Sequence, residues 1–465
     1  MKQTILLSGL CAAVLCGCAD VRVNEYQRPE APAKASWSRP SETAVSASDT
    51  ISPQWWTEFR DPYLDSLVAK AIAGNFDLKI LAARIDVANL QIAEARAGGQ
   101  PSVDIGAGAN LEKSTGQRFS KLLSLGSQVN WDIDVWGKVS KGVQAQTAEF
   151  KATEADWRAG YLTLVAGVST TYFQILQLDE QIERQQRALA RNQQILGIFE
   201  TMRNNGLVPA TQVVRQRAET ARLTKDLLEL RRFRDVSENA LATLLGVPAG
   251  DFKVPAGRLQ GKVQVPVVPT GLPSQLLARR PDVIAAEFRV LVAHDLMGQA
   301  KLAQLPSISL TGRGGSASFA LGDLLKSFTF GLAPSINIPA LNPAIKARAK
   351  TSEAQVKVAE QDYRRTVVAA FEDAENALVN LDAHRQQREQ LQLQVSELRQ
   401  VAATSAAQLA AGLISQLEVF ENERSLLAAE LSLLTSHQQV LADTVTLYKA
   451  LGGGWAAVEV ANARD

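Results

Sequence analysis

Cysteine is missing from almost the whole sequence. The chain has 465 residues and three cysteines, Cys11, Cys16 and Cys18, all of which precede residue 19. Disulfide frameworks, thiolate zinc sites and a cysteine nucleophile are therefore excluded from the rest of the chain. Histidine and methionine are equally rare, with three of each, and the sequence has no Ser/His/Asp or metal-ligand constellation. We expect neither an enzyme nor a metal site.

An excess of charge of either sign is also missing. Lys and Arg total 49 against 48 Asp and Glu, which gives a formal net charge of +1. Nucleic-acid binding depends on neutralising phosphates, and the chain has no polybasic block that could do so. Nucleic acid is therefore not an expected partner. The chain is 46% hydrophobic, which is enough for a folded protein.

The first 17 residues are typical of a secretory signal. Lys2 precedes an apolar run from Ile5 to Leu15 that is too short to span a bilayer. The run ends in Leu15-Cys16-Gly17-Cys18, which resembles the bacterial lipobox. This resemblance implies a mature chain that begins at Cys18, with S-diacylglycerol and N-palmitoyl groups on that residue and no other cofactor. Signal cleavage without a lipid is the alternative.

A segment rich in Pro, Ala, Ser and Glu follows the signal. Residues 18–53 include Pro29, Pro32 and Pro40, which is typical of an extended and poorly packed linker. We expect this segment to space the lipid anchor from the folded body. Removal of residues 1–17 takes away Lys2 and no acid, so the mature chain carries no net charge.

The body of the chain is one unit that occurs twice. Asp77, Leu78, Pro101 and Ser102 recur 205 residues later as Asp282, Val283, Pro306 and Ser307. Gly206, Leu207, Val213, Leu245 and Gly246 recur 206 residues later as Gly412, Leu413, Val419, Leu451 and Gly452. So constant an offset indicates two structurally similar halves. We place the first repeat at 54–255 and the second at 270–456, with a linker at 256–269 and a C-terminal tail at 457–465.

Both repeats have the same predicted order of elements. A helical stretch comes first, at 64–96 and again at 276–302. A β-hairpin follows, because apolar residues alternate with small or polar ones at 103–110 and at 328–338. Each half then enters a very long helix that turns back as an antiparallel one. A helix from about residue 139 to 203 would contain roughly 65 residues and be near 100 Å long.

A heptad seam marks each long helix. Its positions recur in alternating steps of three and four, which is typical of coiled-coil packing. In the first repeat they are Leu164, Val168, Thr171, Ile175, Leu178, Ile182, Gln185, Leu189, Asn192, Leu196 and Phe199. In the second they are Tyr363, Val367, Ala370, Ala374, Ala377, Leu381, His384, Arg388, Leu391, Val395, Leu398, Ala402, Ser405 and Leu409. Each long helix ends at a glycine turn.

Four strands in one chain cannot close a barrel. In lipid, the unpaired backbone groups of a sheet edge cost several kcal/mol each, and the smallest barrels need about eight strands. If the strands lie in a membrane, several chains must share one barrel, and three chains would supply 12 strands. The helical rods then form a hollow cylinder, or a solid bundle if fewer chains pack together.

Five short motifs carry a resemblance to a known family. They are Trp55-Trp56-Thr57-Glu58-Phe59-Arg60-Asp61-Pro62, Trp131-Asp132-Ile133-Asp134-Val135-Trp136-Gly137, Leu277-Ala278-Arg279-Arg280-Pro281-Asp282-Val283, Pro306-Ser307-Ile308-Ser309-Leu310-Thr311-Gly312 and Leu451-Gly452-Gly453-Gly454-Trp455. In this order, and together with the lipobox, they resemble the TolC-like outer membrane efflux lipoproteins, the NodT-type outer membrane factors of tripartite efflux systems. The resemblance covers about residues 18–456.

The resemblance implies a membrane protein of mixed α and β structure. A homotrimer would share a 12-stranded transmembrane β-barrel, four strands per chain, continued by a long periplasmic α-helical barrel of coiled-coil hairpins. The chain would be lipid-anchored in the cell outer membrane and span it, with most residues in the periplasm. The implied partners are a periplasmic adaptor, an inner-membrane transporter of the RND type and outer-membrane lipid. The implied function is passive exit of substrates, whose identity the sequence does not give.

The resemblance also points to a constriction at the helical turns farthest from the barrel. It makes Leu417 a hydrophobic constriction residue and places Glu421 where the family usually has an Asp. Glu418 lies one turn before Glu421 and can share its helix face. A ring of carboxylates would raise the local cation potential and repel itself. The alternative for both glutamates is a solvated acidic face without a gating role.

Residues of the first repeat complete the predicted tip. Gln212 and Arg215 are the counterparts of Glu418 and Glu421, so the carboxylate ring should be three-fold. Arg203, Arg215 and Arg217 either pair with acids of a neighbouring hairpin or are ordinary surface charges. We expect adaptor docking at the two turns, which consist of Gly206, Leu207 and Val208 and of Gly412, Leu413 and Ile414.

The sequence is also compatible with a second function. A lipid-anchored periplasmic coiled-coil scaffold without a pore would use the same anchor and rods. The alternating strands at 103–109 and 328–338 argue against it, because a scaffold has no need of a lipid-facing surface.

Overall fold

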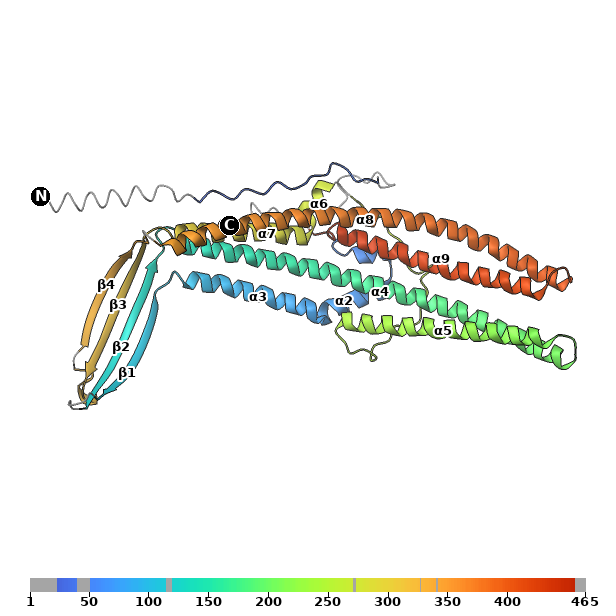
Figure 1. The fold of residues 1–465 in the computed structure, drawn as a ribbon, viewed down its shortest axis with the longest axis horizontal. Helices are drawn as coiled ribbons and strands as arrows, with labels where there is room; N and C mark the ends of the chain where they lie inside the picture. Colours follow the sequence, from blue (N-terminus) through green and yellow to red (C-terminus); the bar gives the residue numbers. More distant parts are fainter. Residues whose placement is uncertain are drawn as a thin grey trace.

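The computed structural model describes residues 23–39, 51–113, 119–270, 273–326, 328–339 and 342–455. It is a long rod of helices with a four-stranded sheet at one end (Figure 1). The elements are η1 Trp55–Phe59, α2 Pro62–Gly74, α3 Phe76–Ala97, β1 Ser102–Glu112, β2 Ser120–Ile133, α4 Lys138–Asn204, α5 Ala210–Leu245, α6 Pro273–Arg279, α7 Pro281–Leu302, β3 Ser307–Ser318, η2 Leu321–Asp323, β4 Phe328–Asn337, α8 Pro343–Ala410 and α9 Gln416–Ala450.

The two longest helices confirm the predicted rods. Helix α4 has 67 residues and α8 has 68, and every predicted seam position on them is buried or partly buried. Asn342 caps α8 by accepting hydrogen bonds from the backbone N–H groups of Ala344 and Ile345. The heptad seams therefore identify the buried faces of both rods.

Shorter helices pack along the two long helices at two levels, one next to the sheet and one next to the hairpin turns. Helix α4 packs against α3 and α7 near the sheet and against α5 and α9 farther away, and α8 packs against α7 and α9. The end of α5 meets the start of α3, where Gly246 has φ 71° and a Cβ on it would overlap the carbonyl oxygen of Gly74. Gly452, with φ 91°, meets Arg279 in the same way at the start of α7. The two repeats thus share one kind of junction.

An aromatic core lies where these levels meet. Trp55 stacks on Tyr448 with ring centroids 5.0 Å apart, and Phe59 lies 5.1 Å from Phe173. These four rings and that of Tyr172 are fully buried. Aromatic burial contributes strongly to stability, so this core fixes η1 against the middle of the rods.

The sheet has two chemically different faces. Its strands are antiparallel in the order β1-β2-β3-β4, so the hairpins of the two repeats lie side by side. Val103, Val129, Gly312 and Leu332 are register partners across the four strands, and the next row is Asp104, Gln128, Arg313 and Gly331. Because side chains alternate between faces, one face of the sheet is mainly apolar and the other is mainly small or polar. Within the described ranges, no helix combines the length and the apolar character needed to cross a membrane.

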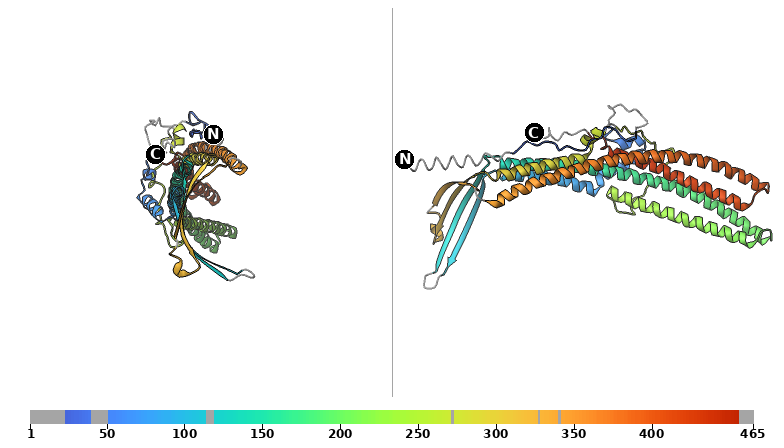
Figure 2. Two further views of the ribbon diagram at one scale, coloured as in Figure 1. Left: turned by 90° about the vertical axis from the view of Figure 1, so that its left-hand side faces the viewer. Right: turned by 45° about the horizontal axis from the view of Figure 1, so that its top comes forward.

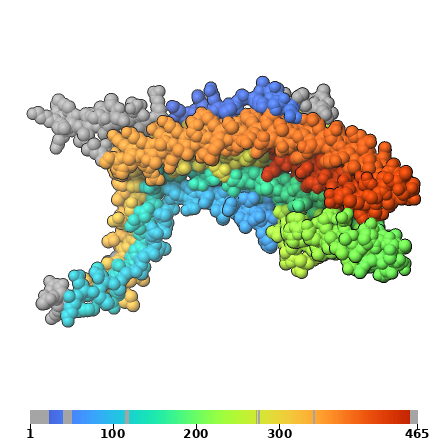
Figure 3. Space-filling view, turned by 45° about the vertical axis from the view of Figure 1, so that its right-hand side comes forward, coloured from blue at the N-terminus to red at the C-terminus, as the bar shows by residue number. Residues whose placement is uncertain are grey.

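Residues 23–39, here called the strap, run along α7 and α8 from the sheet end toward the middle of the rods (Figures 1 and 3). Arg28 donates to Glu287 of α7 at 2.6 Å, and Lys34 and Arg39 pair with Glu375 and Asp382 of α8. The linker was predicted to pack poorly, and this part of it does not. The composition could not show this packing, because the contacts of the strap lie more than 230 residues away in the sequence.

Candidate functional site: the helical tips and the cavity above them

The two hairpin turns lie together at the end of the rods opposite the sheet (Figure 2). Gly206 has φ 74° and Gly412 has φ 73°. Leu207 N–H bonds to Met202 O at 2.8 Å, and Leu413 N–H bonds to Gln408 O at 2.9 Å. Each turn therefore has the hydrogen bond of a Schellman helix end with glycine in the left-handed conformation, and the equivalence of the two repeats extends to their tips.

The apolar side chains of the turns face away from the core. Leu207 is 69% exposed and Leu413 is 73% exposed, whereas Val208 and Ile414 are half-buried. Exposed leucines at equivalent places of two hairpins suit contact with another protein. Their role in adaptor docking stays a prediction.

The predicted gate residues begin α9. Leu417 is 45% exposed, and the Glu421 carboxylate pairs with Arg424 at 2.8 Å. The Glu418 carboxylate accepts a hydrogen bond from Ser415 N–H at 2.9 Å, and the Ser415 hydroxyl oxygen accepts one from Glu418 N–H. This capping box could have been recognised in the sequence from Ser415 and the glutamate three residues later. Glu418 thus caps the N-terminus of α9, in addition to the gating role predicted for it.

One of the three arginines near the first turn is paired within its own hairpin. Arg217 donates to Glu200 at 2.7 Å, so an α5 residue binds one on α4. Arg203 and Arg215 are exposed. Pairing with a neighbouring hairpin, which the sequence left open, is not seen for Arg217.

The ion pairs that do join the two hairpins lie above the turns. Arg191 of α4 contacts Glu423 of α9 at 3.0 Å. Farther from the turns, the Glu430 carboxylate of α9 accepts a hydrogen bond from Arg184 of α4 at 2.7 Å and one from Arg399 of α8 at 2.6 Å. Burial alone would raise the pKa of Glu430, but Arg399 and Arg184 hold it below its usual value. The sequence alone does not reveal these pairs, because i,i+3 and i,i+4 spacing says nothing about contacts between helices.

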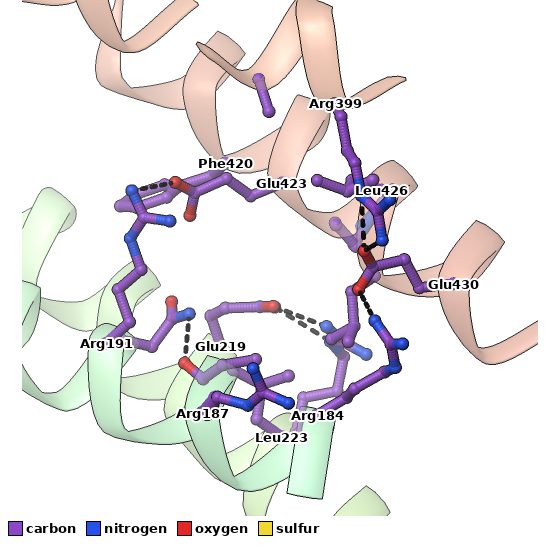
Figure 4. A pocket seen from close by; sticks show the side chains of 16 residues that line it. Arg184, Arg187, Arg191, Glu219, Leu223, Arg399, Phe420, Glu423, Leu426 and Glu430 are labelled. Atoms are coloured by element: carbon purple, nitrogen blue, oxygen red, sulfur yellow. Dashed lines mark hydrogen bonds and ion pairs between the residues drawn. The ribbon is translucent and has the colours of Figure 1, made fainter. Parts of the chain in front are cut away.

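A cavity of about 370 Å³ opens between these bridges, and we call it the lower arginine cavity (Figure 4). Its arginines are Arg184, Arg187, Arg191, Arg222, Arg399 and Arg424, and its carboxylates are Glu219, Glu423 and Glu430. Phe420 borders the cavity and meets Phe199 edge-on at 6.4 Å. A hydrogen bond from Arg222 lowers the pKa of Glu219. Cationic groups therefore dominate the wall between the hairpins.

Metal coordination finds no support in the described residues. No group of three or more His, Cys, Asp or Glu there could hold a metal ion. The tip consists of two turns with exposed apolar residues, the carboxylates at the start of α9 and the ion pairs that arginines form between the hairpins. Such a set can bind partners and close a passage.

The comparison with protein families decides the identity of this architecture. The sequence model described as outer membrane efflux protein matches residues 67–247 and 272–453, so its two segments start 205 residues apart and end 206 apart. The chain belongs to the outer membrane efflux protein family. The family resemblance is thereby confirmed, and so is the internal repeat of the efflux protein.

Individual relatives agree over nearly their whole length. The efflux protein is 29% identical over 436 residues to the pyoverdine export outer membrane protein OpmQ of Pseudomonas putida, covering 91% of this chain and 92% of the relative. It is 28% identical to a probable outer membrane lipoprotein, SilC, of Salmonella typhimurium, covering 98% and 100%. A crystal structure of CusC, studied for transmembrane channel formation, matches with a TM-score of 0.82 and 25% identity over 93% of this chain and 99% of that one.

These findings settle the class of the efflux protein. It is the outer-membrane exit channel of a tripartite efflux system, and its fold is that of a trimer with a shared 12-stranded barrel and a periplasmic helical part. The apolar face of the sheet is the side that meets lipid, and the polar face lines the passage. The tips lie at the periplasmic end because they are farthest from the sheet.

Proposed function

We propose that the efflux protein conducts substrates passively from a periplasmic adaptor and an inner-membrane transporter of the RND type to the cell exterior. The main support for this proposal is that one polar face continues across all four strands of the sheet. This sheet lies at the end of rods formed by helices of 67 and 68 residues. Such a face can line an aqueous passage, which the rival scaffold would not need. The protein catalyses no reaction, and the transporter supplies the energy.

The same proposal assigns the turns and the start of α9. Leu207, Val208, Leu413 and Ile414, with their turn glycines, dock the adaptor, supported by the exposure of the two leucines. Leu417, Glu418 and Glu421 close the passage at the periplasmic end, supported by their place in the first turns of α9. Adaptor binding there opens it by separating these carboxylates from the arginines of the neighbouring hairpin.

Planar-bilayer conductance tests the passage and its gate. Changing Glu418 and Glu421 together to Gln removes two negative charges per chain, and Gln at 418 can keep the capping box with Ser415. We expect the double variant to conduct more than the wild type, because Gln cannot form the ion pairs with arginines of a neighbouring hairpin, such as the exposed Arg203 and Arg215, that would hold the tip shut. The control is Glu397→Gln, an exposed glutamate on α8.

The outcomes separate the two parts of the proposal. Absence of conductance in every variant would contradict the channel. Equal conductance in the wild type, the double variant and the control would leave the channel standing and remove the gate from Glu418 and Glu421.

The lipid anchor belongs to the same proposal. Cys18 lies outside the described residues, and its S-diacylglycerol and N-palmitoyl groups would hold the N-terminus in the outer-membrane lipid. In support, a Cβ on Gly298, near the sheet end of α7, would contact Val23 of the strap at 3.0 Å. The strap therefore begins at the sheet end of the molecule, where an anchor in the outer membrane would hold it. Labelling with radioactive palmitate should be lost in Cys18→Ser, and retained label would contradict the assignment.

A further inference from the structure

A second cavity lies beside the lower one, across the bridge that Glu430 makes with Arg184 and Arg399. It has a volume of about 400 Å³, and we call it the upper arginine cavity. Helices α4, α8 and α9 form it together with the segment between the repeats, which contributes Gln260. It therefore adjoins both repeats of the chain.

Positive charge is in excess around the upper arginine cavity. Arg184, Arg388 and Arg399 line it, and Glu430 is its one lining carboxylate. Arg184 and Arg399 share Glu430. Among the described residues, Arg388 has no carboxylate within ion-pair distance, and its Nε is buried without a hydrogen-bond acceptor. One guanidinium is therefore uncompensated.

His437 shows the effect of that uncompensated charge. Its Nδ1 lies 3.5 Å from Nη1 of Arg388, and because arginine can only donate, the histidine proton belongs on Nε2. That Nε2 is also buried without a partner. Burial and the charge of Arg388 lower the pKa of His437 to about 4, so the ring is neutral at pH 7. The wall of the cavity thus offers donors and few acceptors.

We propose that the upper arginine cavity binds a small oxyanion of the phosphate or carboxylate class. An oxyanion is an acceptor-only ligand that matches the planar donors of guanidinium groups. It would supply the negatively charged acceptor that Arg388 lacks, after a small movement of the arginine side chain. Because Arg184 is on α4 and Arg388 and Arg399 are on α8, the bound anion would also tie the first repeat to the second at this level.

Thermal unfolding in inorganic phosphate tests the site. The trimer in mild detergent is titrated with phosphate, and chloride at equal ionic strength serves as reference. We expect a saturable rise of Tm with phosphate in the wild type, because binding to the native state alone stabilises it. Phosphate also strengthens burial in general, so Arg388→Gln supplies the baseline. This variant should have a higher Tm than the wild type in chloride and only the general phosphate effect.

The matched control is Arg232→Gln. Arg232 binds Glu229 three residues earlier on α5, outside both cavities, and its variant should respond to phosphate as the wild type does. Equal phosphate responses in the wild type and in Arg388→Gln would overturn the proposal. So would a wild-type response that does not saturate.

A second readout does not depend on stability. The chain has only three histidines, so carbon-13 labelling of their rings gives three signals, and His437→Gln assigns one of them. An anion beside Arg388 should raise the pKa of His437 by about one unit or more. An unchanged His437 titration at saturating phosphate would also overturn the site.

Discussion

At the scale of single residues, the strap depends on one buried carboxylate. Glu287 is 3% exposed, and its described ion-pair partner is Arg28 of the strap. Burial raises the pKa of Glu287 although Arg28 opposes the rise. The two residues are 259 positions apart, so no local pattern could have predicted their contact. A segment that looked like a spacer therefore compensates a charge in the second repeat.

Removal of Arg28 should destabilise the body of the protein, although Lys34 and Arg39 still hold the strap to α8. Arg28→Ala leaves Glu287 buried without its partner, which costs about 1–3 kcal/mol. We expect a lower Tm for Arg28→Ala and recovery of much of the loss in the double variant with Glu287→Gln. Thermal unfolding of the trimer measures both. A double variant as unstable as Arg28→Ala would show that the strap acts through other contacts.

His437 should make the protein sensitive to acid. Its pKa is about 4 in the folded chain and about 6.5 when unfolded. Between these values the unfolded chain binds more protons than the folded one. The contribution of the neutral His437 to the free energy of unfolding is therefore fully present above pH 6.5 and is lost as the pH falls toward 4. His437→Gln should therefore lose less Tm than the wild type between pH 7 and pH 4 in chloride buffers. Parallel Tm curves would contradict this role.

At the scale of elements, the heptad seams predicted the rods well, because a buried stripe leaves a period in the sequence. The glycine turns were found for a similar reason, since only a few residue types tolerate positive φ. The bridges of Arg184 and Arg191 to α9 were not found. They depend on which helices become neighbours, and that follows from the packing of both repeats.

The junction between α5 and α3 should be intolerant of any side chain. Gly246→Ala introduces a Cβ that overlaps the carbonyl oxygen of Gly74 and also strains a φ of 71°. Gly250→Ala is the matched control, because its φ is 94° but nothing lies within 4 Å of the added Cβ. We expect Gly246→Ala to lose about 1–3 kcal/mol more than the control. Equal unfolding temperatures would contradict the close approach.

The two faces of β4 should respond oppositely to charge. Phe330 lies on the apolar face and Thr329 on the polar one, as the alternation in their register shows. Lysine on the lipid side of a barrel costs about 2–4 kcal/mol near the bilayer centre. We expect Phe330→Lys to reduce the amount of heat-resistant protein in outer-membrane fractions and Thr329→Lys to leave it near the wild-type level. Equal effects of both would contradict the assigned faces.

At the scale of the whole molecule, the barrel exists only in the assembly. Each chain provides four strands with open edges at β1 and β4. Dilution in detergent should therefore lower the mass from trimer to monomer and expose the amides of β1 and β4 at the same time. Light scattering combined with hydrogen exchange follows both events. Protected β1 and β4 amides in monomers would contradict a shared barrel.

The order of the strands also shapes the outside of that barrel. On the apolar face, Gly312 and Gly314 of β3 lie beside the bulky Leu332 and Phe330 of β4. A Cβ on Gly314 would lie 3.1 Å from the ring of Phe328, so large side chains of β4 cover the glycines of β3. In a closed trimer, β4 of one protomer meets β1 of the next, which presents Val103 and Ile105 on the same face. Each of the three seams between protomers is therefore bordered on both sides by large apolar side chains that face the hydrocarbon of the bilayer.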